Sequence, residues 1–308
     1  MYGPMAIGVL AGVLGMAPAD RVDVVVVTDI GAEVDDQWAL AHMALSPEID
    51  VKGVVTTHAP NLSEPAAEAS ARFANELIAK FPAKVRPKVL VGSSKPLTDP
   101  GKTLPGAGAD FLIEQSKGYG GSRRLIVVIT GAATDVASAL IAEPTWADRV
   151  TVVAMAFNEY PKGTDPWNVK NDPIAWRLLL DSRVPIVVGD AGITRKHLRM
   201  TPDRAHTLLA TLPDPATALL SRFDSWIAQN AKLAESDTGS AIVWPIWDEV
   251  TTAHLLGMTK VETRPRPRLR NDLTFDLDNP KGTIDWVTSI DEGRLWTDLV
   301  AKIKAGAR

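Results

Sequence analysis

Three aspartates lie within eight residues near the start of the chain: Asp29, Asp35 and Asp36. Asp29 closely follows a run of valines at 24–27 that predicts a buried strand of a parallel sheet, and a helical pattern begins at Asp35. Like charges held close together raise one another's pKa or require a counter-ion, and residues 22–51 contain no Lys or Arg. Because oxygen ligands favour hard ions, the spacing predicts a Ca²⁺ or Mg²⁺ site.

A simpler interpretation of these aspartates is that they cap a helix. An Asp at a helix start often does no more than bind free backbone N–H groups and complement the helix dipole. Two adjacent aspartates and a third at the strand end exceed what a cap needs. The turn at Gly31 also follows the carboxyl end of a strand, which is where open α/β sheets place their ligands. The position therefore favours a site.

The composition indicates one large folded domain. The 308 residues are 45% hydrophobic and 23% charged, without a low-complexity linker or an internal repeat, so we expect a single domain over 20–308. The net charge of -4 argues against nucleic acid as a partner, because that binding depends on clustered cations. The absence of Cys excludes disulfides and thiolate metal sites.

The first 19 residues resemble an export signal. An apolar segment at 5–16 precedes Ala17-Pro18-Ala19, a small-x-small pattern typical of signal cleavage, and is too short to span a bilayer. No basic residue precedes Arg21, so a disordered tail on a cytoplasmic protein is the alternative. We expect residues 1–19 to be a signal peptide and the protein to be periplasmic or secreted, with no membrane span.

Strand and helix patterns alternate along the chain, which predicts an α/β fold with a mostly parallel central sheet and helices on both faces. The expected strands are 22–28, 51–57, 89–91, 125–129, 150–155 and 186–188. The expected helices are 35–45, 65–81, 134–142, 173–180, 202–212, 215–233, 248–256 and 292–305. Near the C-terminus, 261–278 and 283–288 predict an antiparallel pair of strands at the sheet edge.

Four segments in order resemble one enzyme family. Thr28-Asp29-Ile30-Gly31-Ala32-Glu33-Val34-Asp35-Asp36 is similar to the aspartate-rich motif of the inosine/uridine-preferring nucleoside hydrolases, with two extra residues before the paired aspartates. The segment 129–135 resembles the family's Thr-Gly-x-x-Thr-Asn motif, 167–173 resembles its substrate loop, and Trp247-Asp248 stands where a His-Asp pair is usual. The resemblance covers residues 22–256 and implies a Rossmann-like nucleoside hydrolase fold, in a divergent member.

The resemblance also implies a set of site residues. The Ca²⁺ ligands would be Asp29, Asp36, the carbonyl of Thr130 and Asp248. The ion would hold the ribose 2′- and 3′-hydroxyls and a water molecule, with Asp29 as the general base. Asp35 would act with Asp29 in the catalytic centre by gripping a ribose hydroxyl. The implied reaction is hydrolysis of an N-riboside to ribose and a free base, and the family also implies a homo-oligomer.

The expected contacts to the sugar are less complete. Asn168 would hold a ribose hydroxyl beside Trp167, and Asn158 would contact the 5′-hydroxyl. The glutamate usual before the aromatic-Asn pair is Pro166 here, so its 5′ contact is lost or moves to Asp165.

Two further departures concern the ion and the base. Val27 replaces a common Asp two residues before Asp29, which removes a carboxylate that would support the ion. Trp247 replaces the His that protonates the leaving group in many members, so a base would stack on Trp244 or Trp247 instead. We infer that metal and diol binding are kept while the leaving group or 5′ substituent differs.

Other polar residues carry weaker hypotheses. His58 follows the second expected strand and is either a substrate contact or a structural residue. Asn61 matches an early pocket Asn of the family, although Pro60 aligns as well. The remaining His residues lack the spacing of a zinc site.

Three other patterns predict structure, not chemistry. The segment 106–108 predicts a flexible loop over the pocket, and Arg264, Arg266, Arg268 and Arg270 predict an exposed, solvated edge. Trp38 and Trp176 are expected in the core.

Two other functions remain open from sequence. The chain could be a non-catalytic Ca²⁺-dependent ribosyl or sugar-binding protein that keeps the ion and diol site. A metal-dependent phosphoesterase would need basic phosphate ligands, and none lies near the aspartates in sequence.

Overall fold

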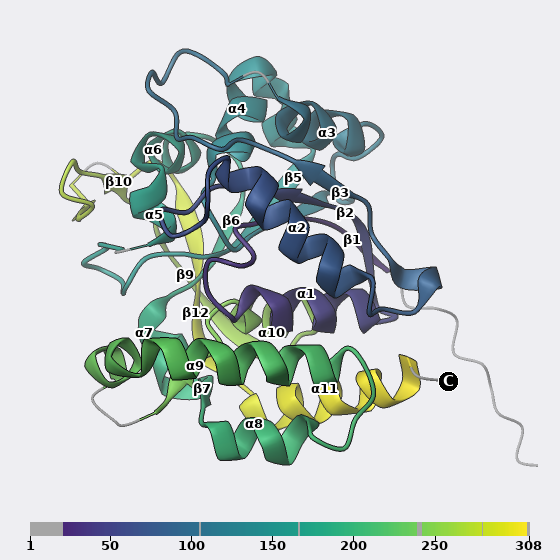
Figure 1. The fold of residues 1–308 in the computed structure, drawn as a ribbon. Coiled ribbons are helices and arrows are strands. Elements are labelled where there is room, and N and C mark those ends of the chain that lie inside the picture. Colours follow the sequence, from purple (N-terminus) through teal and green to yellow (C-terminus); the bar gives the residue numbers. More distant parts are fainter. Residues whose placement is uncertain (1–20, 105, 166, 239–241, 279, 307–308) are drawn as a thin grey trace, which may run out of the picture.

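The computed structural model describes residues 21–104, 106–165, 167–238, 242–278 and 280–306. Its centre is an eight-stranded sheet in the order β3-β2-β1-β4-β5-β6-β12-β9, parallel except for β9 at one edge (Figure 1). The strands are β1 (Val22–Thr28), β2 (Ile49–Thr56), β3 (Val89–Val91), β4 (Leu125–Ile129), β5 (Val150–Met155), β6 (Ile186–Gly189), β9 (Thr259–Pro265) and β12 (Thr283–Ile290). The predicted mostly parallel α/β sheet is confirmed.

The valines of β1 explain why the sheet is covered on both faces. Val24 and Val26 belong to one buried cluster and Val25 and Val27 to another. Successive side chains of a strand point to opposite faces, so an unbroken apolar strand needs packing on each side.

Helices supply that packing in two layers. The first face is covered by α1 (Asp36–Leu45), α2 (Ala66–Ile78), α7 (Ala191–His197) and α10 (Glu249–Leu255), and the second by α3 (Ala107–Ser116), α4 (Thr134–Ala142), α5 (Asn168–Asn171) and α6 (Pro173–Asp181). In Figure 1, α8 (Pro202–Leu209), α9 (Ala216–Thr238) and α11 (Glu292–Gly306) form a further layer below α1 and α10. Trp38 packs edge-on against Phe223 and Trp296 of that outer layer, so its predicted core position is confirmed, as is that of Trp176.

Short elements complete the chain. They are the 3-10 helices η1 (Ala83–Val85) and η2 (Pro144–Asp148) and the two-residue strands β7 (Arg199–Met200), β8 (Trp244–Pro245), β10 (Arg268–Leu269) and β11 (Phe275–Asp276). Within the described residues, no helix is long and apolar enough to cross a membrane. The expected signal peptide at 1–19 lies outside the described residues.

The C-terminal strand prediction was partly wrong. The segment predicted as one strand at 261–278 forms β9, β10 and β11. The antiparallel pairing of β9 with β12 is confirmed, but β12 lies inside the sheet because it also pairs with β6. The prolines at 265 and 267 interrupt the ladder, which explains why the segment divides.

The expected flexible loop at 106–108 was wrong, and the expected solvated edge was wrong for Arg266, whereas Arg268 and Arg270 are exposed. Helix α3 begins at Ala107, and a Cβ at Gly108 would collide with the Asp135 carboxylate, so this segment is packed and not a flexible lid. Arg266 is only 5% exposed and donates to the carbonyl oxygens of Ser182, Val184 and Thr283. Its guanidinium therefore joins loop and strand ends instead of facing solvent.

Candidate active site

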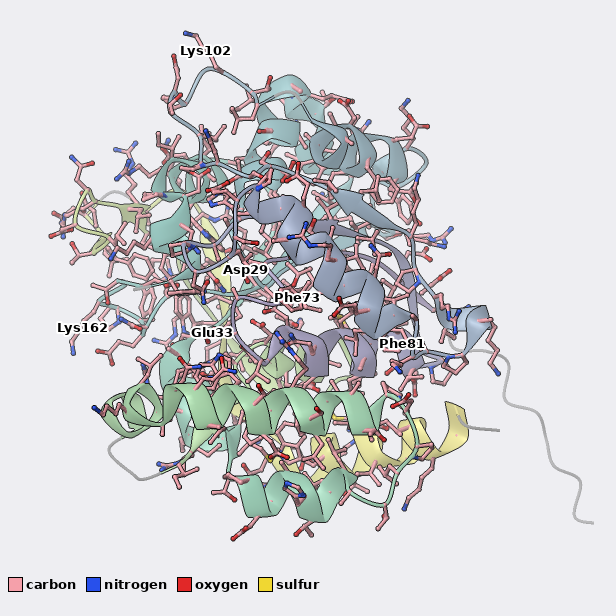
Figure 2. The ribbon with its side chains drawn as sticks, viewed as in Figure 1. Asp29, Glu33, Phe73, Phe81, Lys102 and Lys162 are labelled. Carbon is pink, nitrogen blue, oxygen red and sulfur yellow. The ribbon has the colours of Figure 1, made fainter. Side chains whose placement is uncertain are left out.

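The carboxyl ends of neighbouring parallel strands bring two distant segments together. Val27 of β1 pairs with Ile129 of β4, so Asp29 and Thr130 emerge side by side at one edge of the sheet. A Cβ at Gly131 would lie 2.6 Å from the backbone nitrogen of Asp29, which shows how closely the two chains approach. Figure 2 labels Asp29 and Glu33 in the turn that leads from β1 to α1.

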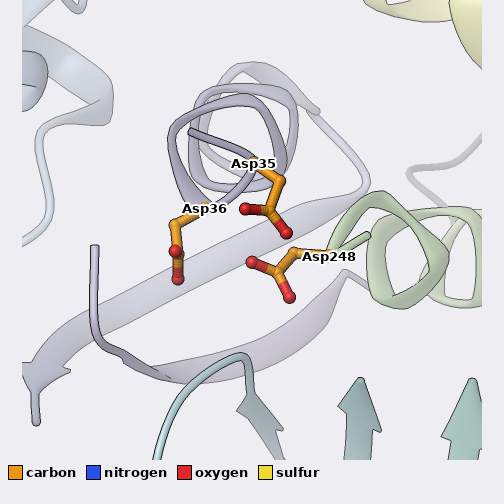
Figure 3. A group of neighbouring side chains, drawn as sticks. All are labelled: Asp35, Asp36 and Asp248. Atoms are coloured by element: carbon orange, nitrogen blue, oxygen red, sulfur yellow. The ribbon is translucent and has the colours of Figure 1, made fainter. Parts of the chain in front are cut away.

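A third segment completes the cluster. Asp35 and Asp36 start α1, and Asp248 directly precedes α10. Carboxylate oxygens of these three residues all lie within 4.8 Å of one another, and Figure 3 shows the side chains facing a common space. Two separate stretches of sequence therefore meet here, and Asp29 lines the same cavity but is not one of these three mutually close carboxylates.

The helix-cap interpretation does not account for this arrangement. Neither Asp35 nor Asp248 makes a side-chain hydrogen bond that caps its own helix. The side chains of both residues turn instead toward Asp36. A cap would direct its carboxylate at the first free backbone N–H groups of the helix.

Hydroxyl groups hold part of the cluster in place. Thr130 Oγ1 donates to Asp36 Oδ1 at 3.0 Å, and Thr28 Oγ1 donates to the same oxygen. Asp29 is 2% exposed, and its Oδ2 is buried without a hydrogen-bond partner among the described residues. A buried carboxylate oxygen without a partner is costly, so it marks a place where a cation or a ligand donor fits.

Burial and mutual repulsion disfavour the charged forms of these acids. Burial, followed by the charges of Asp36, Glu33 and Asp35, raises the pKa of Asp29 well above its ordinary value. Burial and the charge of Asp36 raise the pKa of Asp35 to about 7. Burial raises the pKa of Asp36 to about 6 despite the two threonine hydrogen bonds, and burial followed by the charges of Asp35, Asp36 and Asp29 raises the pKa of Asp248.

The donor set fits a hard divalent ion. It offers the carboxylate oxygens of Asp35, Asp36 and Asp248 from two segments and the partnerless Oδ2 of Asp29, with Thr130 in the same cavity lining. A divalent cation would offset the repulsion that raises these pKa values. The residues expected to hold Ca²⁺ are therefore gathered where such an ion could be held.

The cluster forms the floor of a cavity of about 380 Å³. Its other walls come from β5, the loop after it, helices α5, α7 and α9, strand β8 and the residues just before α10. The lining residues are Asp29, Glu33, Asp35, Asp36, Thr130, Met155, Phe157, Asn158, Asp165, Trp167, Asn168, Ala191, Arg195, Leu233, Trp244, Trp247 and Asp248. A volume of this size suits a small organic ligand.

Comparison with known proteins identifies the fold and the family. The family model of inosine-uridine preferring nucleoside hydrolases matches residues 24–297. The chain belongs to this nucleoside hydrolase family. A curated relative, a probable uridine nucleosidase 2 from Arabidopsis thaliana, is 26% identical over 213 residues, which are 61% of this chain and 65% of that protein.

Solved structures share the architecture. A plant nucleoside hydrolase superposes with a TM-score of 0.72 at 17% identity, covering 92% of this chain and 99% of its own. A purine-preferring ribonucleoside hydrolase from Gardnerella vaginalis superposes with a TM-score of 0.69 at 19% identity and the same coverage. At these identities the likeness establishes the fold alone.

Most of the residues that the family resemblance implied line this cavity. Asn168 Nδ2 donates to the carbonyl of Met155, while its Oδ1 is buried without a partner among the described residues. That oxygen is available to accept from a ligand hydroxyl. Asn158 also lines the cavity, with its amide donating to Thr164 Oγ1, and Trp167 and Trp247 supply aromatic walls.

Asp165 lines the cavity, but its hydrogen bonds give it a structural role. Its two oxygens accept the backbone N–H groups of Phe157 at 2.7 Å and Trp167 at 2.6 Å. Burial raises its pKa to about 6 in spite of these bonds. The geometry therefore favours Asp165 as the residue that shapes the loops around Asn158 and Trp167, and it does not favour a 5′-hydroxyl contact.

His58 and Asn61 do not line the cavity that holds the aspartates. His58 faces an adjoining cavity that shares only Trp167 with the first, and its Nε2 lies 3.0 Å from Thr134 Oγ1. The Thr134 hydroxyl already donates to Asp172, so the His58 ring nitrogen is the donor in a structural chain of hydrogen bonds. Asn61 is exposed, and its amide donates to the carbonyl of Ala32.

Sequence reasoning missed Arg195, which lines the cavity from α7. Its guanidinium carbon lies 4.9 Å from the centre of the Trp247 ring. The sequence does contain a pattern that predicts helix α7. Asp190 caps the helix by accepting from Ile193 N, and three basic residues occupy its last turn. The contact between Arg195 and Trp247 could not be predicted, because the two residues lie far apart in the sequence.

Proposed function

We propose that this protein hydrolyses the N-glycosidic bond of a ribonucleoside or related N-riboside in a Ca²⁺-dependent reaction that releases ribose and a free base. The observation that supports it most is the close approach of the Asp35, Asp36 and Asp248 carboxylates in a cavity of nucleoside size that Asp29 and Thr130 also line. Membership of the nucleoside hydrolase family supports the same activity.

The ion would be held by Asp29, Asp36, Asp248 and the Thr130 carbonyl. When bound, Ca²⁺ would supply the positive charge that fixes the vicinal ribose hydroxyls and makes a water molecule easier to deprotonate. Asp29 would accept the proton of that water, since its buried Oδ2 has no partner among the described residues. The carboxylate of Asp35 and the Oδ1 of Asn168 would accept hydrogen bonds from the ribose hydroxyls and orient the sugar.

The remaining carboxylates favour the transition state. As the bond to the base lengthens, positive charge develops on the anomeric carbon and the ring oxygen of the sugar. Six acidic side chains line the cavity, so a positive sugar is stabilised there more than a neutral one. Trp244 and Trp247 form an apolar wall against which the base would stack.

A second candidate is a non-catalytic Ca²⁺-dependent protein that binds a ribosyl or sugar ligand in the same cavity. The observation in its favour is that no His lines the cavity among the described residues, so the usual proton donor for a leaving base is absent. Binding would then occur without turnover.

The test is ribose release from a panel of purine and pyrimidine nucleosides with Ca²⁺, for the wild type and for Asp29→Asn. The hydrolase is supported by release that the variant loses while it still folds. The outcome that favours the binding protein is no release from any riboside while Ca²⁺ and ribose together still raise the melting temperature.

A further inference from the structure

A second cavity adjoins the one that holds the aspartates. Its volume is about 400 Å³, and among the described lining residues the two cavities share only Trp167, which stands as a wall between them. The second cavity lies between the loops after β2 and β3, the N-terminus of α2 and helix α5. The proposed hydrolysis uses none of these groups except Trp167.

The charge of the second cavity differs from that of the first. Six carboxylate side chains line the first cavity. The described lining of the second includes Lys95 and Lys170, and Glu64 is its only carboxylate. Neither lysine ammonium group forms an ion pair or a hydrogen bond with a described residue. Two unpaired cations in one recess attract an anion.

His58 adds a ring nitrogen that can share a proton. Its side chain is 7% exposed and lines the second cavity. Its Nε2 donates to Thr134 Oγ1, which donates in turn to Asp172, so these bonds fix the orientation of the ring. The Nδ1 of His58 then has no hydrogen-bond partner among the described residues. A polar nitrogen without a partner in a buried side chain marks a place where a ligand fits.

Neutral donor groups complete the lining. Asn171 Nδ2 is buried without a partner among the described residues. Ala66 is the first residue of the 13-residue helix α2, and Pro65 before it gives no side-chain cap. Ser94 Oγ accepts only the N–H of Ala67 in this first turn. The partial positive charge of such a helix N-terminus favours an anion.

A phosphate group matches this combination of donors and a shared proton. Its oxygens accept from ammonium, amide and backbone N–H groups. The second pKa of a phosphate monoester is about 6, so near neutral pH it exchanges a proton readily with an imidazole. The monoanion donates to a neutral Nδ1, and the dianion accepts from the Nδ1 of a protonated ring. A carboxylate at this pH has no proton to donate to Nδ1.

We propose that the second cavity is a binding site for a phosphate group, which is held by Lys95, Lys170 and His58 at the N-terminus of α2. Two sources of this group fit its position across Trp167 from the aspartates. One is the 5′-phosphate of a riboside whose sugar lies in the first cavity, and the other is a separate phosphate-bearing anion. Only the first source rests on the proposed function.

Calorimetric titration with inorganic phosphate tests the site directly, in Ca²⁺-loaded protein from which free Ca²⁺ has been removed. For the double variant Lys95→Gln, Lys170→Gln we expect the affinity for phosphate to fall at least about tenfold. Lys102→Gln is the matched control and should bind phosphate normally, because Lys102 is an exposed lysine of the same segment between β3 and α3, outside the cavity lining (Figure 2). No phosphate binding by the wild type, or equal binding by the double variant, would overturn the site.

Two further measurements locate the bound anion. Asp36→Asn should bind phosphate as the wild type does, which separates the site from the ion in the first cavity. Burial lowers the pKa of His58 against the opposing charges of Asp172 and Glu64, and a bound anion favours the protonated ring. The NMR signals of His58 should therefore titrate at higher pH in phosphate than in chloride. Lost phosphate binding in the Asp36 variant, or an unchanged His58 titration, would place the anion elsewhere and overturn the proposal.

Ribose 5-phosphate distinguishes the two sources. If the phosphate belongs to the riboside, this compound should bind at least about tenfold more tightly than either ribose or phosphate, because one molecule occupies both cavities. If the anion is separate, ribose 5-phosphate should bind no more tightly than phosphate, and ribose and phosphate should bind together. Phosphate binding by a protein that cleaves no riboside would support this site and contradict the hydrolase, so the two proposals fail separately.

Discussion

His42 Nδ1 lies 3.1 Å from Glu249 Oε2, in a contact that is fully buried on both sides. The other ring nitrogen of His42 lies 2.9 Å from Asp298 Oδ2, which also pairs with Lys302. His42 belongs to α1, Glu249 to α10 and Asp298 to α11. Because α1 begins at Asp36 and α10 directly follows Asp248, this contact ties together the two helices that present the acidic cluster.

Replacing His42 should lower the free energy of unfolding, because it removes the contact between α1 and α10. His42→Gln leaves the buried carboxylate of Glu249 without its cationic partner, and breaking a buried pair in this way costs about 3–5 kcal/mol. Urea unfolding of the wild type and the variant measures the difference. Arg183→Gln breaks the exposed pair with Asp148 and serves as the control, with little expected change in stability because water and salt screen exposed pairs. A His42 variant as stable as the control would contradict the structural role.

The same contact should depend on pH. Burial lowers the pKa of His42, but the charge of Glu249 and the hydrogen bonds with Asp298 and Glu249 outweigh it and raise the pKa above the ordinary 6.5. A raised pKa in the folded state means that the stabilisation is complete below 6.5 and is lost as pH rises through the higher value. The stability difference between wild type and His42→Gln should therefore be larger at about pH 6 than at about pH 9. An unchanged difference would show that His42 is neutral in the folded protein.

Removing divalent ions should make the stability of the protein fall as pH rises from acid to neutral. The pKa values of Asp35 and Asp36 are raised to about 7 and about 6 in the folded chain, so these groups hold protons that they release on unfolding. In chelator, stability should fall as pH rises from the ordinary 3.8 through about 7. Added Ca²⁺ should raise the melting temperature more at about pH 8 than at about pH 5, because protons compete for the ligands. A Ca²⁺ effect that is equal at both pH values speaks against these carboxylates as the ligands.

One carboxylate of the cluster can be tested by removing its charge. Asp36→Asn should abolish the rise in melting temperature on adding Ca²⁺, yet it should raise stability in chelator because it removes a buried like charge. Calorimetric titration with Ca²⁺ should show affinity reduced at least about tenfold. Asp99→Asn, in the loop before α3 and outside the residues that line the cavity, is the control and should bind Ca²⁺ normally. Equal Ca²⁺ binding by the two variants would remove Asp36 from the site.

Two nearby glycines test the packing of α3. Gly108→Ala should cost about 1–3 kcal/mol, since its Cβ would meet the buried carboxylate of Asp135. Gly106→Ala adds a Cβ with no atom within 4 Å and should be nearly neutral. Thermal unfolding of both variants decides the question. If neither substitution lowers the melting temperature, the segment 106–108 is a flexible loop, which would contradict its packing against Asp135.

Much of the fold was predictable because it depends on patterns that repeat locally. The valine run of β1, with neighbours on both faces, identified a central parallel strand with Asp29 just after its carboxyl end, whereas Thr130 was assigned through the family resemblance. Asp248 could be assigned only through the family resemblance, since no local pattern says which distant helix start faces α1.

The errors arose where tertiary contacts override local composition. Gly108 has the composition of a loop but is required by close approach to Asp135. Arg266 lies among prolines and other arginines but donates to three backbone carbonyl oxygens. Arg195 reaches the site from a seven-residue helix, so neither its charge nor its position in sequence revealed its contact with Trp247.

The most direct test of the account is ribose release from uridine by protein that has been treated with chelator and then titrated with Ca²⁺. We expect no release in chelator and a saturable recovery as a single site fills, with no recovery for Asp36→Asn. Undiminished release in excess chelator, or no release from any riboside at any Ca²⁺ concentration, would contradict it.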